Sequence, residues 1–359
     1  MKLDYIFSNL KILELSSVLA GPLAGSFFAE LGAQVTKVEN KLSGGDITRQ
    51  WKLPEENQEA ASGAYYHSAN YGKQVVFLDF NDTKDKNTLA NLIESSDIII
   101  SNFQKKVAEK FDLSPDTLHK KFPEKIIAQL NAYNYEDPRP GFDLIMQAET
   151  GFISMNGTTD GTLCKMPVAM IDIMASHQIR EAILIALLHK GSSGKGSLIH
   201  VSLFQSGIAS LANQASNYLM AGKVAKPLGT LHPNIAPYGD LFKSSDGIIF
   251  LLGVGSDHQF KKLCDILNFP EEISVNYFNN STRLQKRKNL QEILQAVFSQ
   301  KTFQYLQSSF RMYDIPFAEI KNIGEVFQNS LSQSMVLQEK MENGQKTFSV
   351  SNIAFQFFK

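Results

Sequence analysis

One carboxylate lies inside a markedly apolar stretch of the chain, residues 165–177, which reads K-M-P-V-A-M-I-D-I-M-A-S-H. Eight of these thirteen residues are apolar, and the carboxylate belongs to Asp172. Burial of a charged group is costly unless the group is paired or has a chemical task. A desolvated and oriented carboxylate is what covalent catalysis requires of an aspartate nucleophile.

A purely structural role for Asp172 is also open. The apolar pattern over residues 172–188 predicts a long helix, and aspartate is a preferred N-cap residue. The two roles are compatible, because the amides and the dipole at a helix N-terminus would hold the carboxylate ionised. The residue types alone do not decide between the nucleophile and the N-cap.

Glycine-containing turns give weaker signals. The turn at 15–25 lacks G-x-G-x-x-G, and the segment 191–197 has the wrong spacing for a P-loop. The segment G-V-G-S-D at 253–257 follows an expected strand. There, Gly253 and Gly255 would permit close approach of the backbone to a ligand, or a positive φ in a turn.

Basic side chains lie near the ends of several expected strands. Each one alone is an ordinary surface charge, but several in one crevice would form a phosphate site. They are Lys37, Lys41, Arg49, Lys73, Lys105, Lys106 and Lys110. His177 and His189 lie on the apolar helix without a G-x-S-x-G motif in the chain, so a hydrolase triad has little support.

The composition is that of a globular protein with about two domains. The 359 residues are 43% hydrophobic, and 35 basic residues face 36 acidic ones, which argues against a general nucleic-acid binder. The two cysteines, Cys164 and Cys264, are too few and too distant for a disulfide framework or a zinc site. We therefore expect no metal, and a cytoplasmic location. We find no signal peptide and no apolar run of membrane-spanning length.

Strands alternate with helices along the first two thirds of the chain, which predicts a parallel α/β sheet. The expected helices there cover 22–31, 84–95, 172–188 and 204–221. The expected strands are 11–16, 33–39, 75–80, 97–101, 125–130 and 198–203.

A second region follows a linker and predicts a smaller α+β domain. Its expected strands are 247–252 and 316–320, and its amphipathic helices cover 258–267, 283–298 and 302–312. The last thirty residues look less regular. The predicted division is a large domain over 1–221 to which 326–359 return, a linker over 222–229, and a small domain over 230–325.

Several segments, in this order and spacing, resemble the family III CoA-transferases, which include α-methylacyl-CoA racemase. The similar segments are K-I-L-E-L-S-S-V-L-A-G-P-L-A-G, L-G-A-Q-V-T-K-V-E-N, S-G-G-D-I-T-R, N-Y-G-K-Q-V-V-F-L-D-F, S-D-I-I-I-S-N-F, P-G-F-D-L-I-M-Q-A-E-T-G, P-V-A-M-I-D and H-P-N-I-A-P-Y-G-D-L-F. The resemblance covers about residues 10 to 260 well. It implies a Rossmann-like large domain and a homodimer of two interlocked chains.

The resemblance also implies roles for individual residues. Asp172 falls at the position of the family's catalytic aspartate. Coenzyme A or acyl-CoA would bind as a substrate, with no tightly bound cofactor, at Ser17, Val18, Leu19, Ala20, Lys41, Lys73, Asn102, Phe103 and Lys110. Phe142, Asp143, Gly253 and Gly255 would lie beside the reacting acyl group.

The implied reaction moves CoA from an acyl-CoA to a small carboxylic acid through a covalent aspartyl intermediate. The racemase branch instead needs an acid and base pair and has a G-H-D motif. Here the motif reads G-F-D over residues 141–143, and Phe142 carries no proton. Leu19 stands where the oxalate-using enzyme has glutamine, so oxalate is not supported as substrate.

Two alternatives stay open beside the transferase. One is an acyl-CoA racemase or epimerase that uses other acid and base partners. The other is a CoA-ester-binding paralogue without catalytic activity, because the loop at 131–140 lacks the glycine-rich form common in the family.

Overall fold

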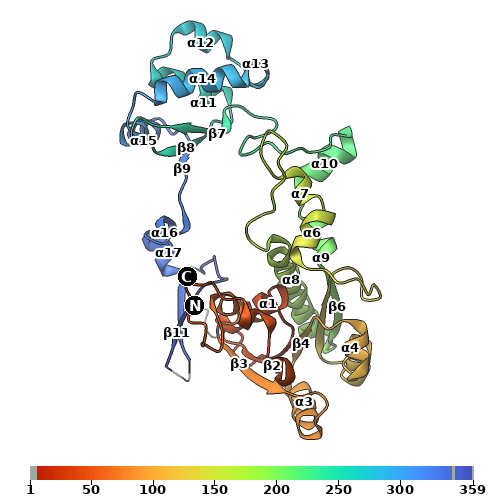
Figure 1. Cartoon of the computed structure of the whole chain (residues 1–359). Helices are drawn as coiled ribbons and strands as arrows, with labels where there is room; N and C mark the ends of the chain where they lie inside the picture. Colours follow the sequence, from red (N-terminus) through yellow and green to blue (C-terminus); the bar gives the residue numbers. More distant parts are fainter. Residues whose placement is uncertain (1–5, 342–343, 358–359) are drawn as a thin grey trace. The chain divides into compact units, whose positions relative to one another are not determined.

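The computed structural model describes residues 6–341 and 344–357 of the chain, which form two compact units (Figure 1). The first unit contains the described residues up to Ile153, Lys165–Ala225 and the described residues from Gln333 onward. The second contains Ser154–Cys164 and Lys226–Ser332. The chain therefore contributes to the second unit twice, which the sequence analysis did not anticipate.

The first unit is built on a six-stranded parallel sheet, as predicted. Its strand order is β3-β2-β1-β4-β5-β6. The strands are β1 (Lys11–Leu15), β2 (Gln34–Asn40), β3 (Lys73–Leu78), β4 (Ile98–Ser101), β5 (Ile126–Asn131) and β6 (Ser197–Ser202). The order reverses between β1 and β4, and in open parallel sheets ligands bind beyond the carboxyl ends of the strands at such a point.

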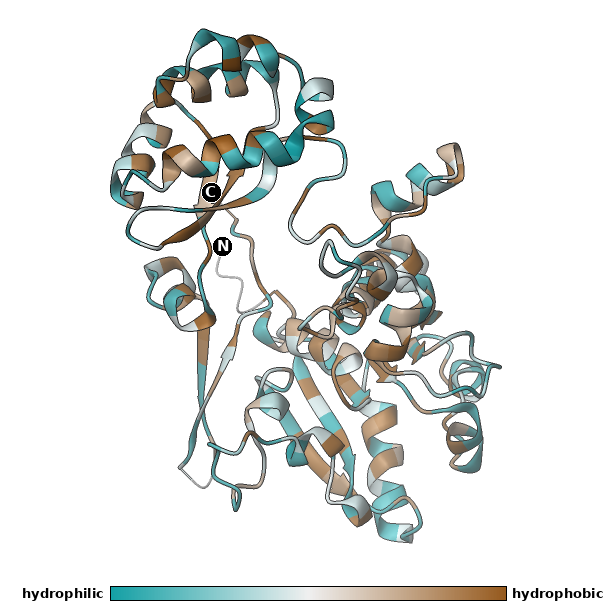
Figure 2. Cartoon of the chain, turned by 45° about the horizontal axis from the view of Figure 1, so that its top comes forward, coloured by the Kyte–Doolittle hydropathy of each residue, from teal (hydrophilic) through white to brown (hydrophobic). Residues whose placement is uncertain are grey.

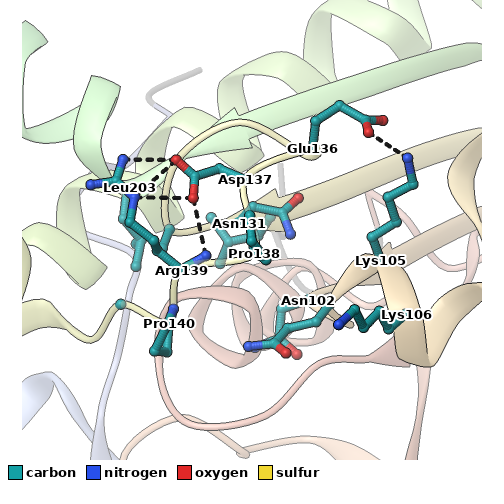
Figure 3. Close-up of a pocket in the computed structure, with 14 residues that line it drawn as sticks. Asn102, Lys105, Lys106, Asn131, Glu136, Asp137, Pro138, Arg139, Pro140 and Leu203 are labelled. Atoms are coloured by element: carbon teal, nitrogen blue, oxygen red, sulfur yellow. Dashed lines mark hydrogen bonds and ion pairs between the residues drawn. The ribbon is translucent and has the colours of Figure 1, made fainter.

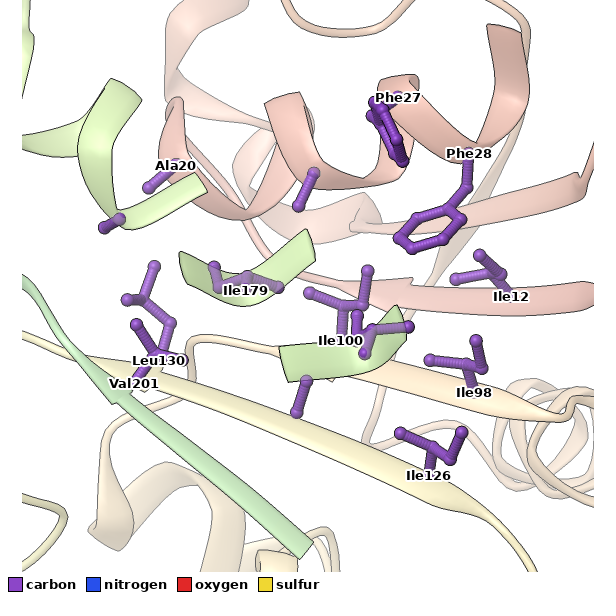
Figure 4. Packing of buried hydrophobic residues seen from close by; sticks show 14 of the residues in the cluster. Ile12, Ala20, Phe27, Phe28, Ile98, Ile100, Ile126, Leu130, Ile179 and Val201 are labelled. Carbon is purple, nitrogen blue, oxygen red and sulfur yellow. The ribbon is translucent and has the colours of Figure 1, made fainter. Parts of the chain in front are cut away.

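Both faces of this sheet are buried, because successive side chains of its strands enter two different cores. Ile12, Ile98 and Ile126 pack on one face with helices α1 (Ala20–Glu30) and α8 (Met170–Ser193), as Figure 4 shows. The residues that follow each of them in the chain pack on the other face with α3 (Thr83–Ser95) and α5 (Pro115–Lys121). The central strands β4 and β5 are accordingly short, largely aliphatic runs, whereas β2 and β6 carry polar residues among the apolar ones.

The remaining elements of the first unit lie largely in its loops and at its chain ends. They are η2 (Lys41–Ser43), η3 (Ile47–Gln50), α2 (Ala64–His67), α4 (Lys105–Lys110), α6 (Asp143–Glu149), α9 (Leu203–Ala209), α10 (Ala212–Ala221), β10 (Val336–Lys340) and β11 (Lys346–Val350). The short helices α7 (Phe152–Met155) and α17 (Ser330–Ser334) each contain residues of both units. Strands β10 and β11 pair as an antiparallel hairpin, so the expectation of an irregular end was wrong. The helix expected over 204–221 is divided into α9 and α10.

The second unit has an antiparallel sheet of three strands, β7 (Tyr238–Lys243), β8 (Ile249–Gly253) and β9 (Phe317–Glu319). Phenylalanine side chains fill its core with edge-to-face and tilted contacts. Hydrophobic and hydrophilic residues alternate along its helices (Figure 2). Those helices are α11 (Asp257–Leu267), α12 (Glu271–Asn276), α13 (Asn280–Gln285), α14 (Arg287–Phe298), α15 (Phe303–Met312) and α16 (Ile323–Val326).

Within the described ranges, no helix combines the length and the apolar character that crossing a bilayer demands. The longest, α8, places Asp172, Arg180 and Glu181 among its apolar residues.

We expect Phe28→Ala to destabilise the first unit by about 3–5 kcal/mol, because it empties a fully buried site. Phe28 makes edge-to-face contacts with Phe7 and Phe27. Urea unfolding followed by the fluorescence of Trp51, the chain's single tryptophan, reports on this unit. Phe355→Ala, at a 46% exposed position of the same unit, is the matched control and should change stability by less than about 1 kcal/mol. Equal losses in both variants would contradict the assigned core.

Candidate active site

Asp172 lies in the first turn of α8 but does not cap it. The helix begins at Met170, its N-cap is Ala169, and no side chain of that residue accepts a hydrogen bond. Asp172 is the third helical residue and is 7% exposed. Its predicted role as N-cap is therefore wrong.

A carboxylate from another helix takes the capping role. Asp143, the first residue of α6, accepts hydrogen bonds through Oδ1 from the amides of Ile171 at 2.7 Å and Asp172 at 3.4 Å. Such amides in the first turn of a helix have no partner within the helix. Asp143 thus acts as a structural hydrogen-bonding partner of α8, and it lies directly beside the backbone of Asp172.

Gln147, which was not among the predicted site residues, fixes this arrangement. Its Nε2 donates to Oδ2 of Asp143 at 2.6 Å, and its Oε1 accepts from the amide of Met166 at 2.8 Å. One buried side chain on α6 therefore holds both the capping carboxylate and the segment that leads into α8. The spacing of four residues between Asp143 and Gln147 on a helix was the available signal.

Burial and, to a smaller extent, the negative charge of Asp143 together raise the pKa of Asp172 to about 7. The helix N-terminus therefore does not by itself keep Asp172 fully ionised near neutral pH. Burial disfavours the charged form, and Asp143 bonds to the amides of Ile171 and Asp172 and brings a like charge. No described side chain donates a hydrogen bond to the Asp172 carboxylate, which leaves its oxygens available to a substrate.

The loop between β1 and α1 contains Ser17, Val18, Leu19 and Ala20, and two side chains fix it. Asn102, which follows β4, donates to the carbonyl of Ser17 at 3.0 Å and accepts from its amide at 3.2 Å. The amide of Val18 donates to Asp46 at 3.1 Å. Val18 has a φ of 73°, a left-handed conformation that is rare for a β-branched residue.

Two cavities open in the first unit near the carboxyl ends of its strands. We call the first the β1–β2 cavity: it has a volume of about 310 Å³ and is lined by Ser17, Asn40, Leu42, Asp79, Phe80, Phe103 and Phe111, among others. We call the second the β4–β5 cavity: it has a volume of about 440 Å³ and is lined by Asn102, Lys105, Lys106, Asn131, Glu136, Arg139 and Leu203, among others (Figure 3).

The basic residues only partly converge. Lys105 and Lys106 line the β4–β5 cavity together with Arg139, whereas Lys105 also pairs with Glu136 and Arg139 pairs with Asp137. Lys41 is exposed beside Leu42 of the β1–β2 cavity. Lys110 lies in a neighbouring cavity that shares Phe80 and Phe111 with the β1–β2 cavity.

Three of the seven basic residues are buried in ion pairs instead. Lys37 pairs with Glu14 and Asp46, and Arg49 pairs with Glu39.

Lys73 also pairs with Glu14, and its ammonium is completely buried. It donates to the carbonyls of Pro22 and Ala69 and to Asn70, which uses all three of its protons. The position implied for Lys73 by the resemblance, in contact with CoA, is therefore not available to this side chain.

The remaining predicted site residues divide between the two units. Phe142 immediately precedes α6 and is 59% exposed, next to Asp143. Gly253 ends β8 and Gly255 follows it in the second unit. Neither glycine has a positive φ, so the expectation of a left-handed turn at these positions was wrong. The backbone at Gly253 is closely approached, because a Cβ there would lie 3.2 Å from Pro316 Cβ.

The chain is similar to known proteins over most of its length. The family model described as CoA-transferase family III matches residues 7–359. The chain is 33% identical over 342 residues to a succinate–glutarate CoA-transferase of Agrobacterium fabrum, which covers 93% of this chain and 85% of the relative. It is also 33% identical over 323 residues to the human succinyl-CoA:glutarate CoA-transferase, over 89% of this chain and 72% of that protein.

A solved structure shares the fold over nearly the whole chain. The crystal structure of a CAIB/BAIF family protein from Brucella suis has a TM-score of 0.84 and 30% identity, and the match covers 98% of this chain and 93% of that one. The full-length family match and these relatives lead to one conclusion: the chain is an enzyme of CoA-transferase family III.

Proposed function

We propose that this enzyme transfers CoA from an acyl-CoA to a carboxylic acid through covalent intermediates on Asp172. One observation carries the proposal: the carboxylate of Asp172 is nearly buried in the first turn of α8, its backbone is held by Asp143, and no side chain among the described residues bonds to its oxygens. Such a group is oriented and poorly solvated, as a nucleophile should be.

The first half of the reaction removes the donor acid. An oxygen of Asp172 attacks the thioester carbon, the C–S bond breaks, and a mixed anhydride and a CoA thiolate result. The thiolate then attacks the carboxyl carbon of Asp172, which releases the donor acid with the aspartate oxygen and leaves an aspartyl-CoA thioester. Holding the thiolate in place and excluding water protect these intermediates.

The second half reverses these steps with the acceptor. The acceptor carboxylate attacks the aspartyl thioester and expels the thiolate, which forms a second anhydride. The thiolate attacks the acyl carbon of the acceptor, and Asp172 leaves as a carboxylate. Charge is conserved throughout, because each step exchanges one anion for another.

We assign the CoA nucleotide to the two cavities at the carboxyl ends of the strands. The rings of Phe80 and Phe103 in the β1–β2 cavity offer faces and edges against which an adenine can pack. Lys106 and Arg139 in the β4–β5 cavity suit phosphate groups. The reversal of strand order between these cavities supports this placement.

For the acids we propose short dicarboxylates. The names of the relatives specify succinate, glutarate, succinyl-CoA, mesaconate and, at 26% identity, oxalate. Succinyl-CoA as donor and glutarate as acceptor are therefore the pair to test first.

The racemase alternative has less support in this site. Moving an α-proton requires two proton-carrying groups. Phe142 has none, and both carboxylate oxygens of Asp143 accept hydrogen bonds from amide groups. Exchange of the α-proton of an acyl-CoA in deuterated water, without a covalent adduct, would favour the racemase.

A homodimer is the assembly we propose. Large apolar side chains on the surface of the first unit include Leu188 on α8 and Leu219 and Met220 on α10, each more than 75% exposed. In the proposed dimer we expect the interface to cover such side chains.

Replacing Asp172 by asparagine should lower turnover by about a thousandfold or more, because the amide cannot form the anhydride. Hydroxylamine added during turnover should convert Asp172 to a hydroxamate, detected by peptide mass spectrometry. Glu181→Gln, on the exposed side of α8, is the matched control and should retain turnover and the trapped adduct. Turnover of folded D172N within tenfold of the original enzyme would exclude the proposed intermediate.

The pH profile should report the titration of Asp172. Because the reactive form is the ionised one, kcat/KM for the acyl-CoA should rise with pH through an apparent pKa of about 7. Asp143→Asn removes a negative charge that raises this pKa, so the acidic limb should move to lower pH. A shift to higher pH, or no acidic limb near 7, would contradict the assignment.

Sedimentation equilibrium should give a mass close to twice the 40.0 kDa of the chain. Refolding of two differently tagged chains together, but not mixing of the folded proteins, should yield mixed dimers if the chains interlock. A monomeric mass at micromolar concentration would refute the dimer, and ready exchange between folded dimers would refute the interlocked form.

A further inference from the structure

In the strained turn after β1, the backbone of each of the residues 16–18 forms a hydrogen bond with a side chain from another segment. Lys37 on β2 donates to the carbonyl of Ser16 at 3.0 Å. Asn102 forms hydrogen bonds with both the amide and the carbonyl of Ser17, and Asp46 accepts a hydrogen bond from the amide of Val18. A left-handed φ of 73° is unfavourable for a valine and persists only where its surroundings impose it.

Asp46 is the centre of this arrangement. Its Oδ2 pairs with Nζ of Lys37 at 2.9 Å, and its Oδ1 accepts from the amide and the hydroxyl of Thr48 at 3.0 and 2.8 Å. Asp46 and Lys37 are both buried, and Glu14 gives Lys37 a second carboxylate at 3.2 Å. With four donors around its two oxygens, this carboxylate has a single orientation.

The charge state of the pair is fixed. Burial alone would raise the pKa of Asp46, but the ammonium of Lys37 and the Thr48 donors lower it below its ordinary value. Burial would likewise lower the pKa of Lys37, but Glu14 and Asp46 raise it. Asp46 therefore stays a strong hydrogen-bond acceptor for the Val18 amide across the working pH range.

The turn that Asp46 holds borders the site proposed for CoA. Ser17 lines the β1–β2 cavity, and Asp46 and Lys37 lie in its wall. We infer that Asp46 is a positioning residue for CoA binding, which acts by imposing the left-handed conformation of Val18. This inference rests on the assignment of the β1–β2 cavity to CoA.

The alternative is that Asp46 only stabilises the fold. A double-mutant cycle with Val18→Gly separates the two, because glycine adopts a positive φ without strain and then needs no such restraint. The readout is the dissociation constant of CoA, measured by titration calorimetry on the full chain in the four variants of the cycle, with KM and kcat measured in parallel.

We expect D46N to weaken CoA binding and to raise KM for the acyl-CoA by about tenfold or more, while kcat changes less than about threefold. In the V18G background the same substitution should weaken binding by less than about threefold. Asp240→Asn, which breaks an equally buried carboxylate pair with Arg287 in the second unit, should leave CoA binding within about twofold.

Equal factors for D46N in both backgrounds, or no effect in either, would overturn the inference. If D46N does not fold, Thr48→Val loosens the same carboxylate by one hydrogen bond, and a weakening of about threefold should again vanish with V18G. Absence of CoA binding in the unmodified enzyme would instead refute the proposed function itself.

Discussion

The site depends on a carboxylate from one helix that caps another. Asp143 on α6 accepts hydrogen bonds from amides in the first turn of α8, so the side chain of Asp172 in the same turn is not needed to cap the helix. The same contact places a second negative charge beside Asp172 and, with burial, brings its pKa to about 7. Capping of α8 and the proposed reaction with substrate are therefore assigned to two aspartates, whereas a single aspartate at the N-cap would have to do both.

A second constraint comes from the parallel sheet. Its strand order reverses between β1 and β4, and the turns after these two strands meet through Ser17 and Asn102. Buried ion pairs under these turns are costly to desolvate and are retained only with good geometry. In this protein they hold a turn in a conformation that its own sequence disfavours.

Much of the first unit could be predicted because aliphatic residues recur in its strands, and the central strands β1, β4 and β5 are buried on both faces. All six strands were located within about two residues. Strand β7, Y-G-D-L-F-K, was missed because glycine and aspartate are poor strand formers and its pattern is carried by contacts within the second unit. The start of α8 was misplaced because Asp143 caps it from 29 residues away along the chain.

The candidate site was predictable in its central residue and less so in its partners. Asp172 stood out by its apolar surroundings. The roles of Gln147 and Asp46 depend instead on hydrogen bonds to Met166 and Val18, which are distant from them in the sequence. Lys73 shows the converse: its type and position suited a phosphate, yet the fold buries it against Glu14. Only the three-dimensional structure distinguishes a lysine whose ammonium is exposed at a strand end from one whose ammonium is buried in an ion pair.

The most direct test of the account is the fate of the acceptor's oxygen. In the proposed sequence the acceptor carboxylate supplies the bridging oxygen of the second anhydride, and that oxygen stays on Asp172 when the new acyl-CoA forms. After turnover with an acceptor acid labelled with ¹⁸O in both carboxylate oxygens, the peptide that contains Asp172 should carry the label. An unlabelled Asp172 after many turnovers would show that the acids exchange CoA without bonding to this residue.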